Sequence, residues 1–229
     1  FELDRDPAKE PTTAEMARAA LDMLSRDNPR GFVLLVENEN IDTTAHNNDI
    51  AALMHALWAF DDAVKVALEF QRRAPGETLV LVTGDHETGG LSATYALRDV
   101  TGPGAKQRIY PTLKELEMIQ GITVSLARAD EALGRAPTAA HVDALVAKHY
   151  PGFTLDADLR EAILERRILE RNLAGYGSVR AALSRMISRQ TGFYWGTTGH
   201  TPEPVAVGAL GPGAHRFRGY QDNTDFARH

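Results

Sequence analysis

Six side chains that could bind metal ions lie in three short polar stretches of the sequence. They are Glu37, Asp42, His46, Asp85, His86 and His200. Oxygen and nitrogen ligands without sulfur suit zinc where histidine is present, and they suit magnesium where every ligand is oxygen. The chain has no cysteine, which excludes disulfides, a thiolate nucleophile and cysteine-bound zinc. Metal binding through carboxylate and imidazole is therefore the chemistry that these residues could support.

The spacing within each stretch limits how the side chains could share an ion. Asp42 and His46 are four residues apart, so they can point at one cation either across a helical turn or around a compact loop. Asp85 and His86 are neighbours and can share a metal only in irregular backbone, because neighbours on a strand point to opposite faces. His200 lies in a loop rich in Gly and Thr. Each pattern alone is also typical of a capping Asp or a surface His, and their combination favours a metal site.

The elements that must position these residues are two strands and the helix between them. Phe32–Val36 and Thr78–Thr83 are apolar runs that predict strands buried on both faces. A helical pattern from about residue 49 to residue 73 separates them, which predicts a parallel βαβ unit. Two polar stretches directly follow these strands, at the strand ends where ligands bind in parallel α/β sheets.

The rest of the chain carries mainly helical signals. Thr12 with Glu15 and Thr112 with Glu115 are capping-box patterns, and the first of them predicts a helix over residues 12–26. Further helices are expected at Thr138–Lys148, Asp156–Asn172 and Ser178–Arg189, and a strand at Pro204–Leu210. We expect three parts: an α/β core segment over residues 1–96, a mainly helical insertion over 97–195 and a returning core segment over 196–229.

Composition narrows the choice of partners. Lys and Arg total 25 and Asp and Glu total 31, giving a formal net charge of −6, which argues against nucleic acid as a specific partner. No apolar run approaches the roughly 18 residues needed to cross a bilayer, so no membrane span is expected. The chain begins with Phe1 rather than Met, which predicts that it is a processed or excised piece of something longer.

Taken in order, three motifs resemble the C-terminal half of a bacterial alkaline phosphatase. They are Val-Glu-x-x-x-Ile-Asp-x-x-x-His at 36–46, Val-Thr-Gly-Asp-His-Glu-Thr-Gly-Gly at 82–90 and Gly-His-Thr at 199–201. Gly-Pro-Gly-Ala at 211–214 and Asp-Asn-Thr-Asp at 222–225 match the closing segment of that family. The resemblance implies an α/β three-layer sandwich, with a mainly parallel sheet, helices on both faces and a helical insertion.

The resemblance also implies two zinc ions, one magnesium ion and hydrolysis of phosphate monoesters through a phosphoserine intermediate. By motif match, Asp42, His46 and His200 would hold the first zinc. Asp85 and His86 would help to hold the second. Glu37 would bind magnesium. A periplasmic or secreted location follows from the same resemblance, and a homodimer is one expectation for the assembly.

Parts of the family's site have no match in this sequence. None of the six serines follows an Asp at a strand end, as the family's nucleophile does; they are Ser25, Ser92, Ser125, Ser178, Ser184 and Ser188. The carboxylate that bridges two metals, the hydroxyl ligand of magnesium and the phosphate-binding Arg are also missing. Thr43 stands where relatives often carry Trp, His or Lys. We therefore expect the isolated chain to lack activity, with the catalytic serine outside it.

Two alternatives to a phosphomonoesterase remain open at this stage. One is a phosphodiesterase or metal-dependent mutase of the same superfamily, since those share the zinc ligands. The other is a non-catalytic, metal-binding α/β module, which the missing nucleophile would allow. Glu37 favours the monoesterase over the diesterase, because the resemblance gives it the third metal.

Overall fold

The computed structural model describes residues 1–99, 106–169 and 177–229, which form two compact units. The first unit comprises Phe1–Arg5, Glu39–Ala56 and Thr88–Thr201, and the second comprises Asp6–Asn38, Leu57–Glu87 and Pro202–His229. The long helix α3 (Ile50–Arg73) contributes its first two turns to the first unit and the rest to the second. The three sequence parts with boundaries at residues 96 and 195 stay a prediction.

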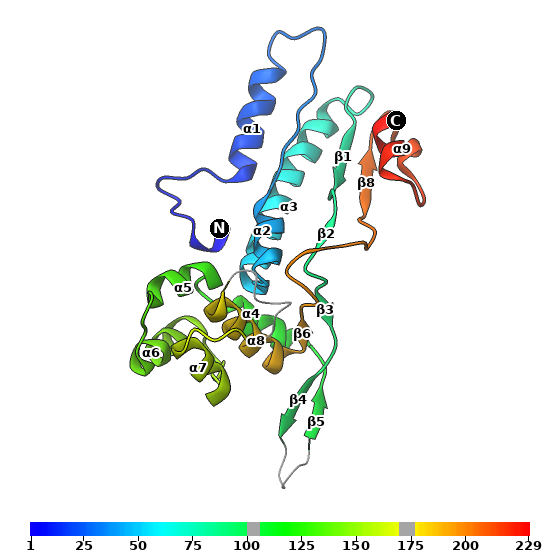
Figure 1. Cartoon of the computed structure of the whole chain (residues 1–229). Helices are drawn as coiled ribbons and strands as arrows, with labels where there is room; N and C mark the ends of the chain where they lie inside the picture. The colour runs from blue at the N-terminus through cyan, green and yellow to red at the C-terminus, as the bar shows by residue number, and fades with distance from the viewer. Residues whose placement is uncertain (100–105, 170–176) are drawn as a thin grey trace. The chain divides into compact units, whose positions relative to one another are not determined.

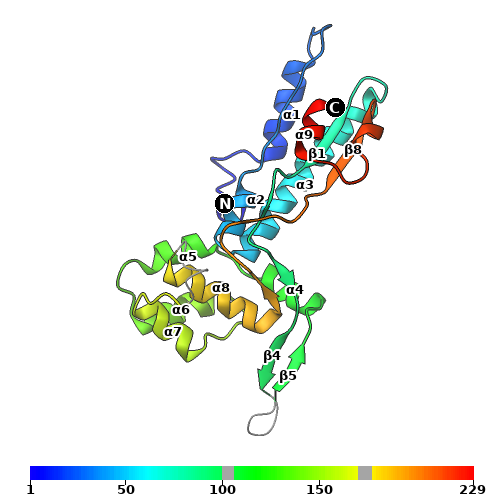
Figure 2. The ribbon, with the colours of Figure 1, turned by 45° about the vertical axis from the view of Figure 1, so that its right-hand side comes forward.

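The first unit is a helical cluster around a buried helix, α8. It contains the short 3₁₀ helix η1 (Glu2–Asp4) and the α-helices α2 (Asn40–His46), α4 (Leu113–Gln120), α5 (Leu126–Leu133), α6 (Ala139–His149), α7 (Ala157–Leu164) and α8 (Ser178–Thr191). Ten of the 14 residues of α8 are buried, among them Leu183, Met186 and Ile187. The helices α5 and α7 pack against α8 (Figures 1 and 2). The helix α8 is thus largely enclosed by its neighbours, although four of its buried residues are Ser or Thr.

Side-chain caps set where several of these helices begin. Thr112 and Glu115 form the expected capping box at α4. Ser125 accepts a hydrogen bond from the backbone of Arg128 and begins α5, and Thr138 caps α6 in the same way. Such caps satisfy N–H groups that have no partner within the helix. The helix expected at Asp156–Asn172 is α7, which ends at Leu164; the predicted end at Asn172 lies outside the described residues.

The strands of the first unit are short antiparallel pairs. β3 (Ser92–Ala93) pairs with β6 (Phe193–Tyr194), and β4 (Ala96–Asp99) pairs with β5 (Lys106–Ile109). β2 (Glu87–Thr88), whose second residue belongs to this unit, pairs with β7 (His200–Thr201). The β2–β7 and β3–β6 pairs join residues 87–93 to the segment that follows α8, whereas β4 and β5 both precede α4.

The second unit packs two helices against an extended segment and an antiparallel strand pair. Its elements are α1 (Thr13–Leu24), the remainder of α3, β1 (Val80–Thr83), β8 (Val207–Leu210), the 3₁₀ helix η3 (Ala214–Phe217) and α9 (Asn223–Arg228). The expected capping box at Thr12 and Glu15 is present at α1. α1 lies beside α3 (Figures 1 and 2), and an Arg18–Glu69 ion pair of 3.1 Å links them.

Two details of the expected sheet differ from the structure. Phe32–Val36 is extended but forms no strand ladder among the described residues, and β1 pairs with β8 in antiparallel register, Val80 opposite Leu210. Phe32, Leu34 and Val36 pack against α1 and α3. The alternate residues face away, since Val33 is 97% exposed and Leu35 is 87% exposed. The prediction that both faces of this segment are buried was therefore wrong. An unbroken apolar run does not reveal whether one face of a strand or both faces are covered by the rest of the chain.

No helix in the described part of the chain is both long enough and apolar enough to cross a membrane. The longest, α3, carries Asp61, Asp62 and Lys65 on its surface, where the lysine forms ion pairs with both carboxylates at 2.9 Å.

Candidate metal centre

The helix α2 places two of the predicted ligands on one face. Asp42 and His46 are one helical turn apart, which is the first of the two arrangements that their spacing allows. The Nε2 atom of His46 lies 3.2 Å from Oδ2 of Asp42. Both side chains are only partly exposed, at 34% for Asp42 and 19% for His46. The pair is therefore fixed by local helix geometry and partly shielded from water.

His200, at the start of β7, completes a cluster of three. Its Nε2 atom lies 3.2 Å from Nε2 of His46 and 3.9 Å from Oδ1 of Asp42. The two imidazole rings are tilted by 40° with their centroids 5.0 Å apart. Residues separated by more than 150 positions in the sequence thus bring two ring nitrogens and a carboxylate to one point in the first unit.

A backbone carbonyl sets the orientation of the His46 ring. Nδ1 of His46 lies 2.5 Å from the carbonyl oxygen of Thr198. A carbonyl can only accept, so Nδ1 carries the proton, and Nε2 presents a lone pair toward His200 and Asp42. Histidines that bind metals are held in this way, with the second ring nitrogen donating to an oxygen. The donor set of two imidazoles and one carboxylate fits zinc, with a fourth position left for water or substrate.

Thr88 holds the carboxylate of Asp42. Its hydroxyl donates a 2.6 Å hydrogen bond to Oδ1 of Asp42, and the Thr88 side chain is buried. A hydroxyl donor on one oxygen reduces the freedom of the carboxylate to rotate and leaves the other oxygen facing His46. The neighbouring Thr43 hydroxyl donates to the carboxylate of Glu39, the residue before α2, rather than to Asp42.

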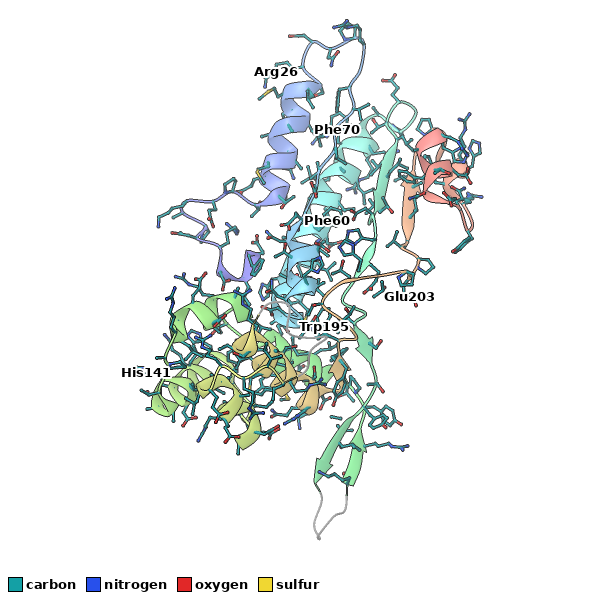
Figure 3. The ribbon with its side chains drawn as sticks, viewed as in Figure 1. Arg26, Phe60, Phe70, His141, Trp195 and Glu203 are labelled. Carbon is teal, nitrogen blue, oxygen red and sulfur yellow. The ribbon has the colours of Figure 1, made fainter. Side chains whose placement is uncertain are left out.

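Gly89 anchors the loop that carries His200. Its N–H donates to the carbonyl of Gly199 at 2.9 Å, and its carbonyl accepts from the N–H of Gly196 at 3.0 Å. Gly89 has a φ of +90°, and a Cβ built there would lie 2.5 Å from the ring of Trp195, which is labelled in Figure 3. Only glycine combines this backbone conformation with so close an approach. The loop therefore reaches the metal ligands because residue 89 has no side chain.

A buried carboxylate fixes the chain directly after α2. Asp49 is 1% exposed; its Oδ1 accepts from the N–H of Ala52 in α3, and its Oδ2 accepts from the N–H of Leu126 in α5, at 3.0 and 2.6 Å. Burial raises the pKa of Asp49 from 3.8 to about 6, against the lowering effect of these backbone donors. One side chain thus joins the first turns of two helices three residues beyond His46.

The other predicted ligands belong to the second unit. Asp85 and His86 directly follow β1 and the intervening Gly84, and the carboxylate of Asp85 lies 3.4 Å from Nε2 of His86. Asp85 is 89% exposed, whereas His86 is 29% exposed. Glu37 is exposed at the end of the extended segment, without a hydrogen bond or ion pair to other described residues. Their assignment to metals stays a prediction.

Sequence reasoning missed three contributors to the centre. Thr88 and Gly89 both lie within the motif at 82–90, but neither was given a role, and Thr198 acts only through its backbone carbonyl. The Gly89–Gly90 pair at the end of this motif was the available signal for Gly89, since glycine permits positive φ and close contact. No feature of the sequence identifies a backbone acceptor such as Thr198.

Comparisons with known proteins identify the family of this chain. The family model described as alkaline phosphatase matches residues 1–229. Alkaline phosphatase 4 of Bacillus subtilis (strain 168) is 31% identical over 228 residues, covering 98% of this chain and 44% of that protein. This chain therefore belongs to the alkaline phosphatase family.

Solved structures give the same result for the fold. The crystal structure of a cold-active alkaline phosphatase from a psychrophilic Shewanella sp. superposes with a TM-score of 0.73 at 33% identity, covering all of this chain and 51% of the other. The Thermus thermophilus alkaline phosphatase gives a TM-score of 0.79 at 25% identity, again over all of this chain and 49% of the other. An alkaline phosphatase-like α/β fold is thus confirmed, and the chain spans about half the length of the relatives that it matches.

Proposed function

We propose that this chain forms part of a metal-dependent phosphomonoesterase and supplies ligands to its zinc ions. The observation that carries the proposal is the convergence of Asp42, His46 and His200 in a member of the alkaline phosphatase family. The Nε2 atoms of His46 and His200 lie 3.2 Å apart, a separation at which they can share either a proton or a cation. A divalent cation between them would explain that arrangement.

The proposed assignment follows the motifs residue by residue. Asp42, His46 and His200 hold one zinc, Asp85 and His86 help to hold a second, and Glu37 binds magnesium. Paired divalent ions of this kind stabilise the attacking and leaving oxygens of a displacement at phosphorus. Thr88 and the Thr198 carbonyl contribute by keeping Asp42 and His46 in the ligating orientation.

The nucleophile is proposed to be a serine outside this chain, acting through a phosphoserine intermediate. Several serines of the chain already have structural roles that occupy their hydroxyls. Ser125 caps α5, and Ser184 donates to the backbone carbonyl of Asn48 at 2.8 Å. Ser178 and Ser188 are buried within α8. None of these four is available to attack a phosphate ester, which supports a nucleophile supplied from elsewhere.

The substrate class proposed is phosphate monoesters, in a periplasmic or secreted enzyme, as the family resemblance implies. The test uses the longer protein that contains this chain, assayed with p-nitrophenyl phosphate and with bis-p-nitrophenyl phosphate. A monoesterase hydrolyses the first far faster than the second, whereas the reverse order would establish the diesterase alternative. His200→Ala in the same protein should lower zinc content and turnover together, while His141→Ala, on the outer side of α6 (Figure 3), should change neither.

A further inference from the structure

The turn that follows α2 contains two buried asparagines, Asn47 and Asn48, which are 5% and 4% exposed. The N–H of Asn48 donates to the carbonyl of Ala45 at 2.9 Å, and the N–H of Asp49 donates to that of Thr44 at 3.0 Å. These two hydrogen bonds form a Schellman motif, which ends the helix that carries two of the predicted zinc ligands.

Asn48 occupies the left-handed position of this motif, with a φ of +54°. Glycine is the usual residue at that position, because it has no Cβ to strain the conformation, and asparagine is the less frequent choice. The conformation alone therefore does not require an asparagine. What asparagine adds over glycine is a side-chain amide.

That amide joins α2 to the loop of residues 196–200, which carries His200. With its oxygen and nitrogen assigned from the acceptors that face them, Nδ2 of Asn48 donates to a carbonyl in the last turn of α2 at 3.0 Å and to that of Thr197 at 2.9 Å. The next carbonyl of the loop, that of Thr198, accepts from Nδ1 of His46. The end of α2 thus holds two successive loop carbonyls, one through a predicted ligand and one through Asn48.

The buried helix α8 supports this turn. Nη1 of Arg180 donates to Oδ1 of Asn47 at 2.8 Å, and the hydroxyl of Ser184 donates to the backbone carbonyl of Asn48 at 2.8 Å. Arg180 and Ser184 are one helical turn apart, so they lie on the same face of α8. Nδ2 of Asn47 in turn donates to the carbonyl of Thr43 in α2 at 2.7 Å, which connects α8 to the ligand helix.

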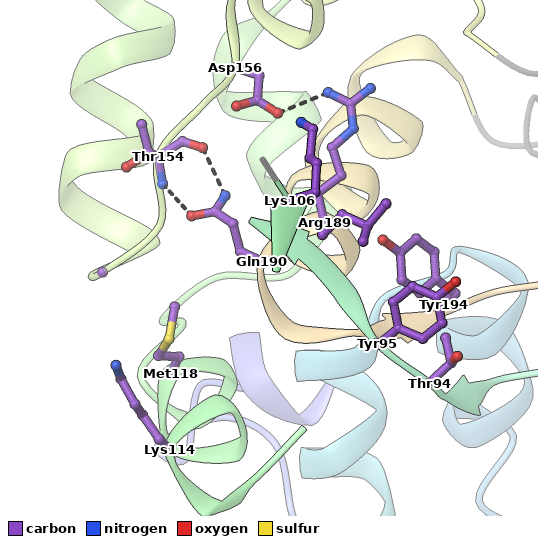
Figure 4. Close-up of a pocket in the computed structure, with 12 residues that line it drawn as sticks. Thr94, Tyr95, Lys106, Lys114, Met118, Thr154, Asp156, Arg189, Gln190 and Tyr194 are labelled. Carbon is purple, nitrogen blue, oxygen red and sulfur yellow. Dashed lines mark hydrogen bonds and ion pairs between the residues drawn. The ribbon is translucent and has the colours of Figure 1, made fainter. Parts of the chain in front are cut away.

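The other end of α8 is anchored by side chains that Figure 4 shows. Gln190 accepts from the N–H of Thr154 at 3.0 Å and donates to its carbonyl at 2.8 Å, and Arg189 donates to the carboxylate of Asp156 at 2.9 Å. Because most of α8 is also buried, it gives the turn after α2 a fixed support.

We propose that Asn48 is a positioning residue of the metal centre, which holds the loop of residues 196–200 against α2 so that His46 and His200 face each other. The inference rests on the proposed function, because it concerns the ligands of the proposed zinc ion. Asn48 acts on these ligands only through the backbone of the loop. Its substitution should therefore weaken zinc binding without removing a ligand.

The test replaces Asn48 by glycine, which permits the left-handed backbone and removes the amide. Hydrogen exchange in the presence of a chelator measures how firmly the loop is held without metal. The N–H groups of Gly196 and Thr197, which donate to the carbonyl of Gly89, should exchange about fivefold faster in Asn48→Gly, the effect of one lost hydrogen bond. Asn48→Asp keeps the size of the side chain but replaces the donor by an acceptor, so it should also speed this exchange.

Asn28→Gly is the matched control. The side chain of Asn28 also donates to a carbonyl at the end of a helix, that of Leu24 at 3.0 Å, but it lies in the second unit. Its substitution should leave the exchange of the loop at the native rate.

Two metal measurements follow the effect on the ligands. The dissociation constant for zinc, titrated against a competing chelator, should rise about tenfold in Asn48→Gly and stay native in Asn28→Gly. Cobalt(II) bound in place of zinc reports the ligand arrangement through its visible absorption. That spectrum should change in Asn48→Gly, whereas a contribution of Asn48 to stability alone would leave it as in the native chain.

Equal loop exchange in the native chain and both Asn48 variants, or an equal dissociation constant for zinc in Asn48→Gly, would overturn the role of Asn48. His200→Ala separates this failure from failure of the proposed function. If zinc binding by the native chain is absent, or is unaffected by His200→Ala, the metal centre itself is wrong. The exchange comparison, made without metal, then still decides whether Asn48 holds the loop.

Discussion

The Nε2 atoms of His46 and His200 face each other at 3.2 Å. Nδ1 of His46 donates to the Thr198 carbonyl, so Nε2 of His46 is an acceptor, and in the absence of a cation Nε2 of His200 must supply the proton between them. A metal ion that takes this position replaces that proton. Metal binding at this centre therefore competes with protons and weakens as the pH falls.

Replacing His200 tests this competition directly. His200→Ala removes one of the two imidazole ligands, and zinc affinity should fall by at least about 100-fold, since losing even an outer contact to a ligand costs 10–100-fold. Zinc titration with a competing chelator measures the change. His141→Ala should leave the affinity unaltered, because His141 lies exposed on α6. Unchanged zinc affinity in His200→Ala would exclude His200 as a ligand.

Gly89 allows a second test, of the loop rather than of a ligand. Gly89→Ala would impose strain at a φ of +90° and a contact of 2.5 Å with Trp195, so we expect a loss of about 2–4 kcal/mol in the free energy of unfolding. Urea denaturation provides the measurement. Gly76→Ala is the control, because a Cβ at Gly76 meets no atom within 4 Å and its φ is not positive. Equal stability of the two variants would show that the loop adjusts without cost.

Local signals in the sequence predicted much of this fold. Both capping boxes, at Thr12 and Thr112, begin helices as expected, because a cap depends only on residues three positions apart. The helix carrying Asp42 and His46 was one of two arrangements that their spacing allowed. The environment of Phe32–Val36 was not predictable in the same way, since the covering of a strand's faces depends on distant segments.

The candidate site was predictable to a similar extent. The resemblance of the motifs named Asp42, His46 and His200 as ligands of one ion, and the structure brings these three side chains together, while their binding of a metal stays a prediction. The contacts that hold them were not visible, because the Thr198 carbonyl has no sequence signature and the hydroxyl of Thr88 meets Asp42 only after the chain has folded. The contact between Thr88 and Asp42 joins residues 46 positions apart in the sequence, and the contact between His46 and His200 joins residues more than 150 positions apart.

Asp49 makes the stability of the chain depend on pH. Its pKa is about 6 in the folded chain against 3.8 when unperturbed, so the folded state binds this proton more tightly than the unfolded state does. The stabilisation is complete below pH 3.8 and is lost as the pH rises to about 6, a change of about 3 kcal/mol.

Asp49→Asn removes the titration and should flatten this decline between pH 4 and pH 7. The variant also loses one acceptor for the N–H groups of Ala52 and Leu126, which lowers stability by a roughly constant amount across this range. Urea unfolding at several pH values, with a chelator present, measures both effects. Asp22→Asn, an exposed position on α1, should keep the native slope. If the stability of Asp49→Asn falls with rising pH as steeply as that of the native chain, other titratable groups cause the fall.

Glu37→Gln tests the magnesium assignment in the longer protein. Removing this carboxylate should lower turnover and alter the response to added magnesium while both zinc ions stay bound, because hard carboxylate oxygens are preferred ligands of magnesium. Metal analysis and activity at varied magnesium concentrations provide the readouts, and Glu77→Gln, an exposed residue after α3, is the control. Loss of zinc from Glu37→Gln would instead place Glu37 at a zinc site.

The isolated chain should bind zinc but hydrolyse no phosphate ester. Asp42, His46 and His200 offer three ligands from one unit, which is enough for a zinc ion with water in its fourth position. Covalent catalysis also needs a nucleophile held against phosphorus, and binding a metal does not supply one. The decisive experiment compares zinc content with p-nitrophenyl phosphate hydrolysis across repeated purification of the chain. Bound zinc with turnover at background level is the expected result. Turnover that rises in proportion to the purified chain and disappears in Asp85→Asn would show that a complete site, nucleophile included, is present within these residues.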